Sequence, residues 1–114
     1  MDAEKYDLIT LGRSCIDLYS QNVGAPFNEI TGFDAFVGGS PLNIAVAASR
    51  LGINTSLLTA VGNDKVGEFI IDFLKTEKVN TKTIPVKKGS RTSAAVLGIQ
   101  PPDNFPLVFY RDNA

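Results

Sequence analysis

The sequence predicts an α/β fold in which parallel strands alternate with helices and an antiparallel hairpin follows. Two observations lead to this prediction. Short apolar runs alternate with helical patterns through the first two thirds of the chain, an order that is typical of parallel strands joined by right-handed crossovers. The last third, residues 90–111, is rich in small, β-branched and aromatic residues around a Pro-Pro-Asp-Asn turn, which is typical of a hairpin.

The bulk composition excludes several classes of protein. Hydrophobic residues make up 44% of the 114 residues and charged residues 20%, which is typical of a globular domain. The net charge is −1 and the lysines and arginines are scattered, so we expect no nucleic-acid partner. A single cysteine excludes an internal disulfide, and the lack of histidine excludes histidine–metal sites. No apolar run approaches the ~20 residues that span a bilayer, so we expect a cytoplasmic protein with no membrane partner.

Three strands and two helices are predicted from the apolar patterns. The strands lie over residues 6–11, 33–37 and 55–61, each of which is a short apolar run. One helix lies over residues 42–51, which are rich in alanine, and the other over 64–75, where apolar residues recur on one helical face. That face consists of Val66, Phe69, Ile70, Phe73 and Leu74.

Both predicted helices carry start and stop signals. Ser40 is the predicted N-cap of the first helix, and Pro41 suits its first turn, where a backbone N–H has no helical partner. Gly52 is expected to end this helix as a left-handed residue. Asp64 is the predicted N-cap of the second helix, and we prefer this capping role to a role in ligand binding.

The glycine turn at residues 38–43 is the first candidate site. Gly38 and Gly39 let a ligand approach the backbone closely, and the following helix presents free N–H groups. Asn43 lies one turn into the helix, where its amide can both donate and accept hydrogen bonds. The spacing matches neither the Walker loop nor GxGxxG, so we do not expect phosphate binding. The alternative is a plain strand-to-helix turn.

Two charged residues near predicted strand ends are the other candidates. Asp17 follows the first strand at its carboxyl end, the edge where open α/β sheets bind ligands, and it can accept hydrogen bonds from two hydroxyl groups of a sugar. Arg111 follows an apolar strand and can pair with a substrate carboxylate in a bidentate way. The alternatives are a solvated or turn-capping aspartate and a surface arginine.

Several of these segments together resemble the ribokinase (PfkB) family of carbohydrate kinases, over essentially the whole chain. The run VGGSPLNIA at residues 37–45, continued by AASRLG at 47–52, is similar to the amino-terminal signature of that family. The pair LG at residues 11–12 followed by Asp17, and the run VGNDKVG at 61–67, stand in the expected order and spacing. Three such motifs make the resemblance specific.

The resemblance implies a ribokinase-like α/β fold in which residues 1–114 form the amino-terminal part of one domain. This part would contain a partial doubly wound parallel sheet and a small antiparallel β lid, with lid segments near 22–37 and 90–111. The resemblance also implies a set of substrate-binding residues, of which the arginine would contact the acid group of a sugar acid. These residues are Asp17, Gly38, Gly39, Asn43 and Arg111.

The same resemblance implies a kinase that uses ATP and Mg²⁺ to phosphorylate a sugar or sugar acid. The glycine-rich anion hole of the family, its catalytic aspartate and its nucleotide site have no match in these 114 residues. The chain also stops at Ala114 without a closing helix. We therefore expect the amino-terminal fragment of a longer enzyme, inactive by itself, in which no catalytic, ATP-binding or metal-binding residue is assigned.

The resemblance also suggests a substrate and a partner. The turn GSPLN and the run at residues 101–111 are most similar to family members that phosphorylate 5-dehydro-2-deoxygluconate, an intermediate of inositol breakdown. The alternative substrates are 2-keto-3-deoxygluconate and fructose. We expect a homodimer through the lid, since open strand edges pair between chains. The alternative class is a non-catalytic sugar-binding or dimerisation module, whereas a dehydrogenase is disfavoured because GxGxxG is missing after the first strand.

Overall fold

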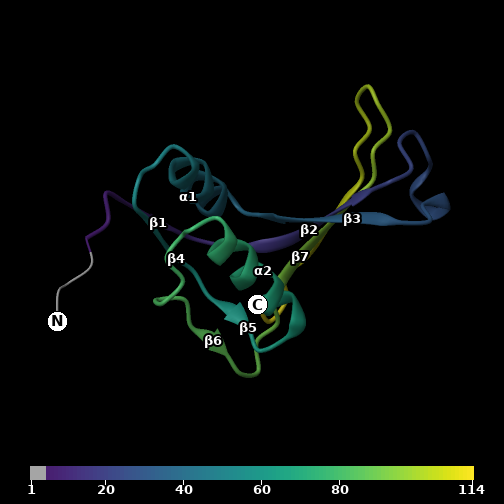
Figure 1. The fold of residues 1–114 in the computed structure, drawn as a ribbon. Helices are drawn as coiled ribbons and strands as arrows, with labels where there is room; N and C mark the ends of the chain where they lie inside the picture. Colours follow the sequence, from purple (N-terminus) through teal and green to yellow (C-terminus); the bar gives the residue numbers. More distant parts are fainter. Residues whose placement is uncertain (1–4) are drawn as a thin grey trace.

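The computed structural model describes residues 5–114 (Figure 1). In chain order its elements are β1 (Leu8–Leu11), β2 (Cys15–Ser20), the short 3₁₀ turn η1 (Phe27–Glu29), β3 (Phe33–Gly38), α1 (Ser40–Arg50), β4 (Thr55–Leu58), β5 (Val61–Gly62), α2 (Lys65–Thr76), β6 (Val86–Lys87), β7 (Ser93–Leu97) and β8 (Leu107–Tyr110). The strands form a parallel β1–β4 pair, a parallel β5–β6 pair and a four-stranded sheet in the order β3-β2-β7-β8.

The structure has two parts. The body comprises β1, β4, β5, β6 and the two helices, with α1 packed against β1 and β4. The four-stranded sheet, which we call the lid sheet, takes β3, β7 and β8 from the two segments expected to form a lid, together with β2, which was not expected there. It extends outward from the body and ends in two loops, residues 21–32 and 98–106 (Figure 1). The loops are joined near this far end, where the N–H of Gly24 donates to the carbonyl of Ile99 at 2.6 Å.

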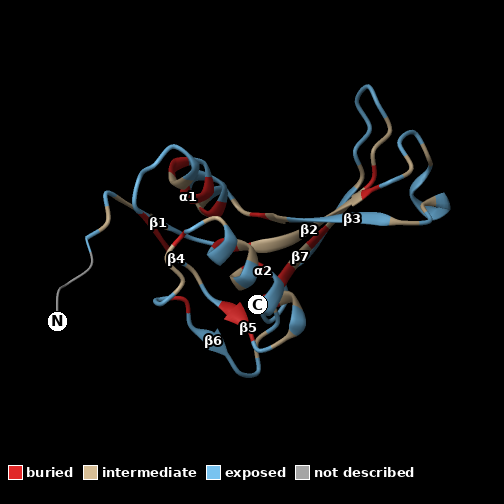
Figure 2. Ribbon diagram, viewed as in Figure 1, coloured by how far each residue is buried: buried red, intermediate tan, exposed pale blue. Residues whose placement is uncertain are grey.

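The hydrophobic core lies in the body. Helices α1 and α2 bring their apolar sides onto β4 and β5, and the segment that follows α2 closes the core. Figure 2 shows buried residues gathered in α1, β4 and β5, while the outer part of the lid sheet is mostly exposed. The core residues are Leu42, Ala45, Val46, Leu57, Val61, Ile70, Leu74, Val79 and Ile84.

The sequence of β2 gives the lid sheet two different faces. Side chains alternate along a strand, so Asp17 shares one face with Cys15 and Tyr19, while Ile16 and Leu18 lie on the other. We predicted no strand here and placed Asp17 beyond the end of the first strand. That placement is wrong, because the chain re-enters a sheet two residues before Asp17.

The predicted antiparallel hairpin is confirmed, and the lid sheet adds a parallel pair to it. Strands β7 and β8 pair antiparallel, with Leu97 opposite Leu107, and β2 and β3 also pair antiparallel. The central pair, β2 and β7, is parallel because both strands run outward from the body (Figure 1). The parallel arrangement predicted for the body is confirmed as well, with Leu8 of β1 opposite Thr55 of β4.

Most of the helix signals are confirmed. Gly52 follows α1 with a φ of +88°, and the Asp64 side chain accepts a hydrogen bond from the N–H of Gly67 at 2.8 Å. One signal is displaced by a residue. Helix α1 already begins at Ser40, so its N-cap is Gly39, which has a φ of +109° and no side chain to cap with. Neither helix within residues 5–114 has the length and apolar character needed to cross a membrane.

Two predictions about the body are wrong in detail. The strand expected over residues 55–61 is divided into β4 and β5, which belong to different sheets, because Val61 turns to pair with the segment of Pro85 and β6. Phe69 was expected on the buried face of α2 but is 43% exposed. It lies roughly 100° around the helix from the fully buried Ile70, and therefore at the edge of that face.

Candidate functional site

The carboxylate of Asp17 is held by side chains of its own strand. The Cys15 thiol donates a hydrogen bond to Asp17 Oδ1 at 3.0 Å. Tyr19, on the other side along β2, shares this face, and its phenol interacts with the same carboxylate. Burial is the main cause that raises the pKa of Tyr19, and the charge and acceptor oxygens of the nearby Asp17 carboxylate add to it. The neutral Cys15 thiol therefore orients a half-buried carboxylate on one face of the lid sheet, and the neutral Tyr19 phenol lies beside it.

Gly38 leaves the space that the Asp17 carboxylate fills. In β3, Gly38 pairs with Cys15, and the next residue on the same face, Phe36, pairs with Asp17. A Cβ atom on Gly38 would overlap Asp17 Oδ2, so the carboxylate would have to leave its present position. Gly39 is required for a different reason, since its φ is +109° and a Cβ there would lie 2.4 Å from the carbonyl oxygen of Arg13.

Arg111 lies on the same face of the lid sheet as Asp17. Phe109 of β8 is opposite Ala95, which is opposite Asp17, and Arg111 follows two residues later. The guanidinium carbon of Arg111 lies 3.6 Å from the centre of the Phe109 ring, a cation–π contact that holds the arginine over this face.

Cys15 is close enough to Arg111 for the positive charge of Arg111 to affect the pKa of its thiol. Burial, the hydrogen bond to Asp17 and the charge of Asp17 raise the pKa of the Cys15 thiol to about 12, although the positive charge of Arg111 and a backbone hydrogen bond with Gly38 act to lower it. The thiol is therefore neutral and remains a hydrogen-bond donor. Cys15 is half-buried and bonded to Asp17.

Asn43 is not joined to this group of residues. Its side chain is exposed and lines a cleft of about 260 Å³ together with Val37 and Phe73. Val37 is on the opposite face of β3 from Gly38, so this cleft opens away from Asp17. The backbone N–H of Asn43 donates to the carbonyl of Gly39 at 2.9 Å, whereas its side-chain amide has no hydrogen bond with residues 5–114. The predicted role of that side chain in binding stays a prediction.

The arrangement on this face suits a hydroxylated ligand that carries a negative charge. Asp17 supplies acceptors for hydroxyl groups, and Arg111 supplies a fork of donors for a carboxylate. Tyr19 and Phe36 add aromatic surface, with their ring centres 5.2 Å apart and their planes tilted by 36°. Sequence reasoning missed Cys15, Tyr19 and Phe36. The alternation of polar and apolar residues in CIDLYS was the signal that could have revealed a strand with Cys15 and Tyr19 beside Asp17.

Asp64 joins the body to the lid sheet. Its Oδ1 accepts hydrogen bonds from the N–H of Gly67 at 2.8 Å and from the Thr92 hydroxyl at 2.7 Å, and its Oδ2 accepts the N–H of Thr92 at 3.0 Å. The Thr92 hydroxyl in turn accepts the N–H of Gly62 at 3.0 Å. Because Thr92 immediately precedes β7, this aspartate fixes the point where the chain enters the lid sheet, which supports a structural role.

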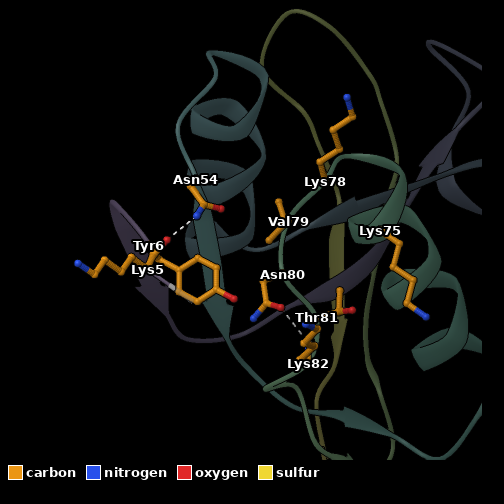
Figure 3. Close-up of a pocket in the computed structure, with 9 residues that line it drawn as sticks. All are labelled: Lys5, Tyr6, Asn54, Lys75, Lys78, Val79, Asn80, Thr81 and Lys82. Carbon is orange, nitrogen blue, oxygen red and sulfur yellow. Dashed lines mark hydrogen bonds between the residues drawn. The ribbon is translucent and has the colours of Figure 1, made fainter. Parts of the chain in front are cut away.

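A separate cleft of about 450 Å³ lies at the amino ends of β1 and β4, and none of the predicted site residues lines it (Figure 3). Asn54 donates to the backbone carbonyl of Lys5 there, and Asn80 accepts the N–H of Lys82. Figure 3 shows the side chains of Lys5, Lys75 and Lys78 leaving the cleft in different directions. These ammonium groups do not converge on a common point.

Comparison with known proteins shows the family. The model of the pfkB family carbohydrate kinase matches residues 5–114. The chain is 41% identical over 109 residues to the 5-dehydro-2-deoxygluconokinase of Bacillus anthracis, which covers 95% of this chain and 33% of that protein. It therefore spans about a third of the length of the curated relatives that it matches.

Solved structures show the same relationship. A sugar kinase of uncharacterised function from Pyrococcus horikoshii, in complex with ATP, superposes with a TM-score of 0.86 at 32% identity, covering 94% of this chain and 35% of that one. The fructokinase of Halothermothrix orenii superposes with a TM-score of 0.82 at 30% identity, covering 92% and 37%. The predicted ribokinase-like α/β fold is confirmed, and the chain belongs to the pfkB family of carbohydrate kinases.

Proposed function

We propose that this chain is the sugar-binding part of a kinase that transfers phosphate from ATP to a hydroxyl group of a sugar or sugar acid. The observation that carries the proposal is the Asp17 carboxylate, held against Gly38 on the same face as Arg111. Kinases of this kind work mainly by positioning the substrate and stabilising charge, so a fixed acceptor for sugar hydroxyls is a necessary part. The family assignment supports the same reading.

Each site residue has a proposed role. Asp17 accepts hydrogen bonds from two sugar hydroxyls, and Gly38 and Gly39 let the sugar approach the backbone. Arg111 binds the carboxylate of a sugar acid, and Asn43 binds a further polar group of the substrate. The proposed substrate is 5-dehydro-2-deoxygluconate, supported by 41% identity to a 5-dehydro-2-deoxygluconokinase. The alternatives are 2-keto-3-deoxygluconate and fructose, the latter supported by 30% identity to a fructokinase.

The proposed reaction needs ATP and Mg²⁺, which supply the phosphoryl group and neutralise its charge during transfer. An ATP complex of a 32% identical sugar kinase supports the use of ATP. Within residues 5–114 no group of three or more histidine, cysteine or acidic side chains could hold a metal ion. We assign no ATP site, Mg²⁺ site or catalytic base to these residues, because the glycine-rich anion hole, the catalytic aspartate and the nucleotide site of the family have no match in the sequence. We expect the 114-residue chain alone to be inactive.

The lid sheet also suggests a partner, a second copy of the chain. Its face opposite Asp17 carries exposed apolar side chains, among them Phe33 at 36% and Val108 at 39% exposure. The outer edges of β3 and β8 are unpaired within residues 5–114. We propose a cytoplasmic homodimer that forms through this sheet.

The dimer is tested by analytical ultracentrifugation. Val108→Asp places a charge on the exposed apolar face and should convert the dimer to a monomer. A monomeric wild-type protein would exclude the dimer.

The kinase proposal is tested with protein made from the complete coding sequence. ATP, Mg²⁺ and each of the three candidate substrates are supplied in turn, and phosphorylated product is measured. Asp17→Ala should lower kcat/KM on the order of 100-fold, since two hydrogen bonds to a charged group are lost. Asp34→Ala is the matched control on the same sheet, because Asp34 is exposed and bonded only to Gln21 among the described residues.

The outcomes separate the alternatives. Unchanged kcat/KM in Asp17→Ala would refute the role of Asp17. Phosphorylation of none of the three substrates would refute the kinase proposal, and sugar binding without phosphorylation would favour a non-catalytic sugar-binding module. ATP-dependent phosphorylation by the 114-residue chain alone would show that the catalytic groups lie within it.

A further inference from the structure

We propose that Cys15 and Tyr19 are positioning residues that fix the Asp17 carboxylate in the one orientation that receives the sugar hydroxyls. This inference rests on the proposed sugar-binding role of Asp17. It adds two residues to the site, neither of which need touch the sugar.

The geometry of β2 places both donors beside the carboxylate. Residues two apart on a strand point to the same face, so Cys15 and Tyr19 flank Asp17 from either side along the strand. The Cys15 thiol lies 3.0 Å from Oδ1, and the Tyr19 phenol interacts with the same carboxylate from the other side. An ionised carboxylate has about four lone-pair sites, so the thiol leaves about three, and a phenol that takes one more leaves about two for the hydroxyl groups of a ligand.

The remaining contacts restrict rotation of the Asp17 side chain. Oδ2 lies 2.0 Å from the place where a Cβ of Gly38 would stand, so the carboxylate rests directly against the backbone of β3. The ring of Tyr19 is itself held against Phe36, with the ring centres 5.2 Å apart. An aspartate on an exposed strand samples several staggered rotamers. Here the thiol, the phenol and the backbone of Gly38 favour a single one.

The chemical nature of the donors preserves the charge of Asp17. A lysine or arginine beside the carboxylate would neutralise it and compete with the sugar. The thiol and the phenol are neutral, and the cation Arg111 on this face lies over Phe109. Burial and the proximity of Asp17 raise the pKa of Cys15 to about 12, so the thiol keeps its proton at neutral pH. The carboxylate is therefore oriented without losing its negative charge.

The first test uses the chain itself, because Cys15 is its single cysteine. The thiol pKa is measured from thiolate absorbance against pH, and the rate of reaction with Ellman's reagent is measured at mildly alkaline pH. Asp17→Asn should lower the thiol pKa and increase the rate at least about tenfold, since each pKa unit changes the thiolate fraction tenfold. An unchanged rate in a variant with wild-type circular dichroism would overturn the proposed contact, because a cysteine that merely fills space would not respond.

The second test uses kinetics of the protein made from the complete coding sequence. Cys15→Ala and Tyr19→Phe should each raise KM for the sugar about tenfold, the effect of one lost hydrogen bond to a charged group, with KM for ATP unchanged. Cys15→Ser should restore most of the loss, because a hydroxyl of similar size also donates. Tyr110→Phe, on the opposite face of the lid sheet, is the control for loss of a phenol and should have no effect.

The outcomes of the two tests distinguish failure of the positioning role from failure of the proposed function. Wild-type KM values in both Cys15→Ala and Tyr19→Phe would overturn the positioning role, and so would equal impairment in Cys15→Ser and Cys15→Ala. If no sugar is phosphorylated by the wild-type protein, the proposed function fails, whereas the thiol measurement still decides whether Cys15 holds the Asp17 carboxylate.

Discussion

The body and the lid sheet are stabilised by different means. The largest fully buried side chains all lie in the body, namely Leu42, Thr55, Leu57, Ile70 and Leu74. The lid sheet leaves large side chains in solvent, for example Phe36 at 50% and Phe109 at 48% exposure. Its strands are held instead by ladders of backbone hydrogen bonds across β3-β2-β7-β8. The candidate site lies on the lid sheet, the part that is held mainly by backbone hydrogen bonds.

This difference suggests that the body supplies stability and that the lid sheet supplies exposed residues for binding. Burial of apolar surface gives the body most of its free energy of folding, at roughly 25 cal/mol per Å². The lid sheet buries little apolar surface, so few of its side chains are required for a hydrophobic core. Its exposed side chains are therefore available for contacts with a ligand or with a second chain. Regions with few buried contacts also open at low free energy, which suits the role in ligand binding that we propose for this sheet.

The largest expected effect separates the two parts directly. Leu74→Ala removes a fully buried side chain from the body and should lower the free energy of unfolding by about 2–5 kcal/mol. Leu107→Ala makes the same change at a residue that is 48% exposed in the lid sheet, and should lower it by less than about 1 kcal/mol. Urea unfolding of both variants measures the difference. Equal losses would show that the lid sheet has a core of its own.

The second effect concerns the contact between β2 and β3. Gly38→Ala forces a methyl group into the position of the Asp17 carboxylate, and should reduce stability by about 1–3 kcal/mol and weaken sugar binding. Asp17→Ala in the same molecule should restore the stability but not the binding. Gly39→Ala is the contrasting variant, since its positive φ and the nearby Arg13 carbonyl make it unfavourable in either background. A Gly38→Ala loss that Asp17→Ala does not relieve would contradict the assigned contact.

The third effect concerns the junction of the two parts. Asp64→Ala removes the helix cap and the bonds to Thr92, and should lower stability at neutral pH by about 0.5–2 kcal/mol. Asp72→Ala, on the exposed side of α2, is the control. Thermal unfolding of both variants gives the comparison. A lid sheet that keeps its hydrogen-exchange protection in Asp64→Ala would show that the junction does not depend on this residue.

Asp64 at this junction should also make the stability of the protein depend on pH. Burial by itself would raise the pKa of Asp64, but hydrogen bonds from Thr92 and from backbone N–H groups of α2 outweigh it and lower the pKa. A carboxylate with a lowered folded pKa contributes stability that is present above its unfolded pKa, about 3.9, and is lost as the pH falls through the folded value. Wild-type stability should therefore decrease over this acidic range, and the decrease should be smaller in Asp64→Ala.

The smallest effect is expected from an ion pair within the body. Arg50 Nε donates to Glu77 Oε2 at 2.8 Å, and this hydrogen bond raises the pKa of Arg50 and lowers that of Glu77. Both groups are accessible to solvent, where salt screens the interaction. Glu77→Gln should reduce Tm by less than any variant above, and the reduction should shrink at high salt. A salt-independent loss would point instead to packing of the Glu77 side chain.

Local signals in the sequence were sufficient for much of the body. Gly52 and Asp64 mark helix ends that the structure confirms, because left-handed glycine and side-chain caps act within a few residues. β2 was missed because only three residues, 12–14, separate it from the end of β1 along the chain, so the two strands were not expected as separate elements. Whether Asn43 takes part in binding stays a prediction, since the cleft it lines opens away from Asp17.

The sequence alone determined the fold class, the glycine turn and the family, because each depends on residues that are close together in the chain. Only the tertiary structure decided which side chains meet. The contact of Asp17 with Gly38 depends on the antiparallel register of β2 and β3, and the position of Arg111 depends on β7 and β8 as well. A shift of one residue in any of these pairings would turn the site residues to the other face, and register depends on how the apolar faces of paired strands and the turns between them fit together in the folded structure.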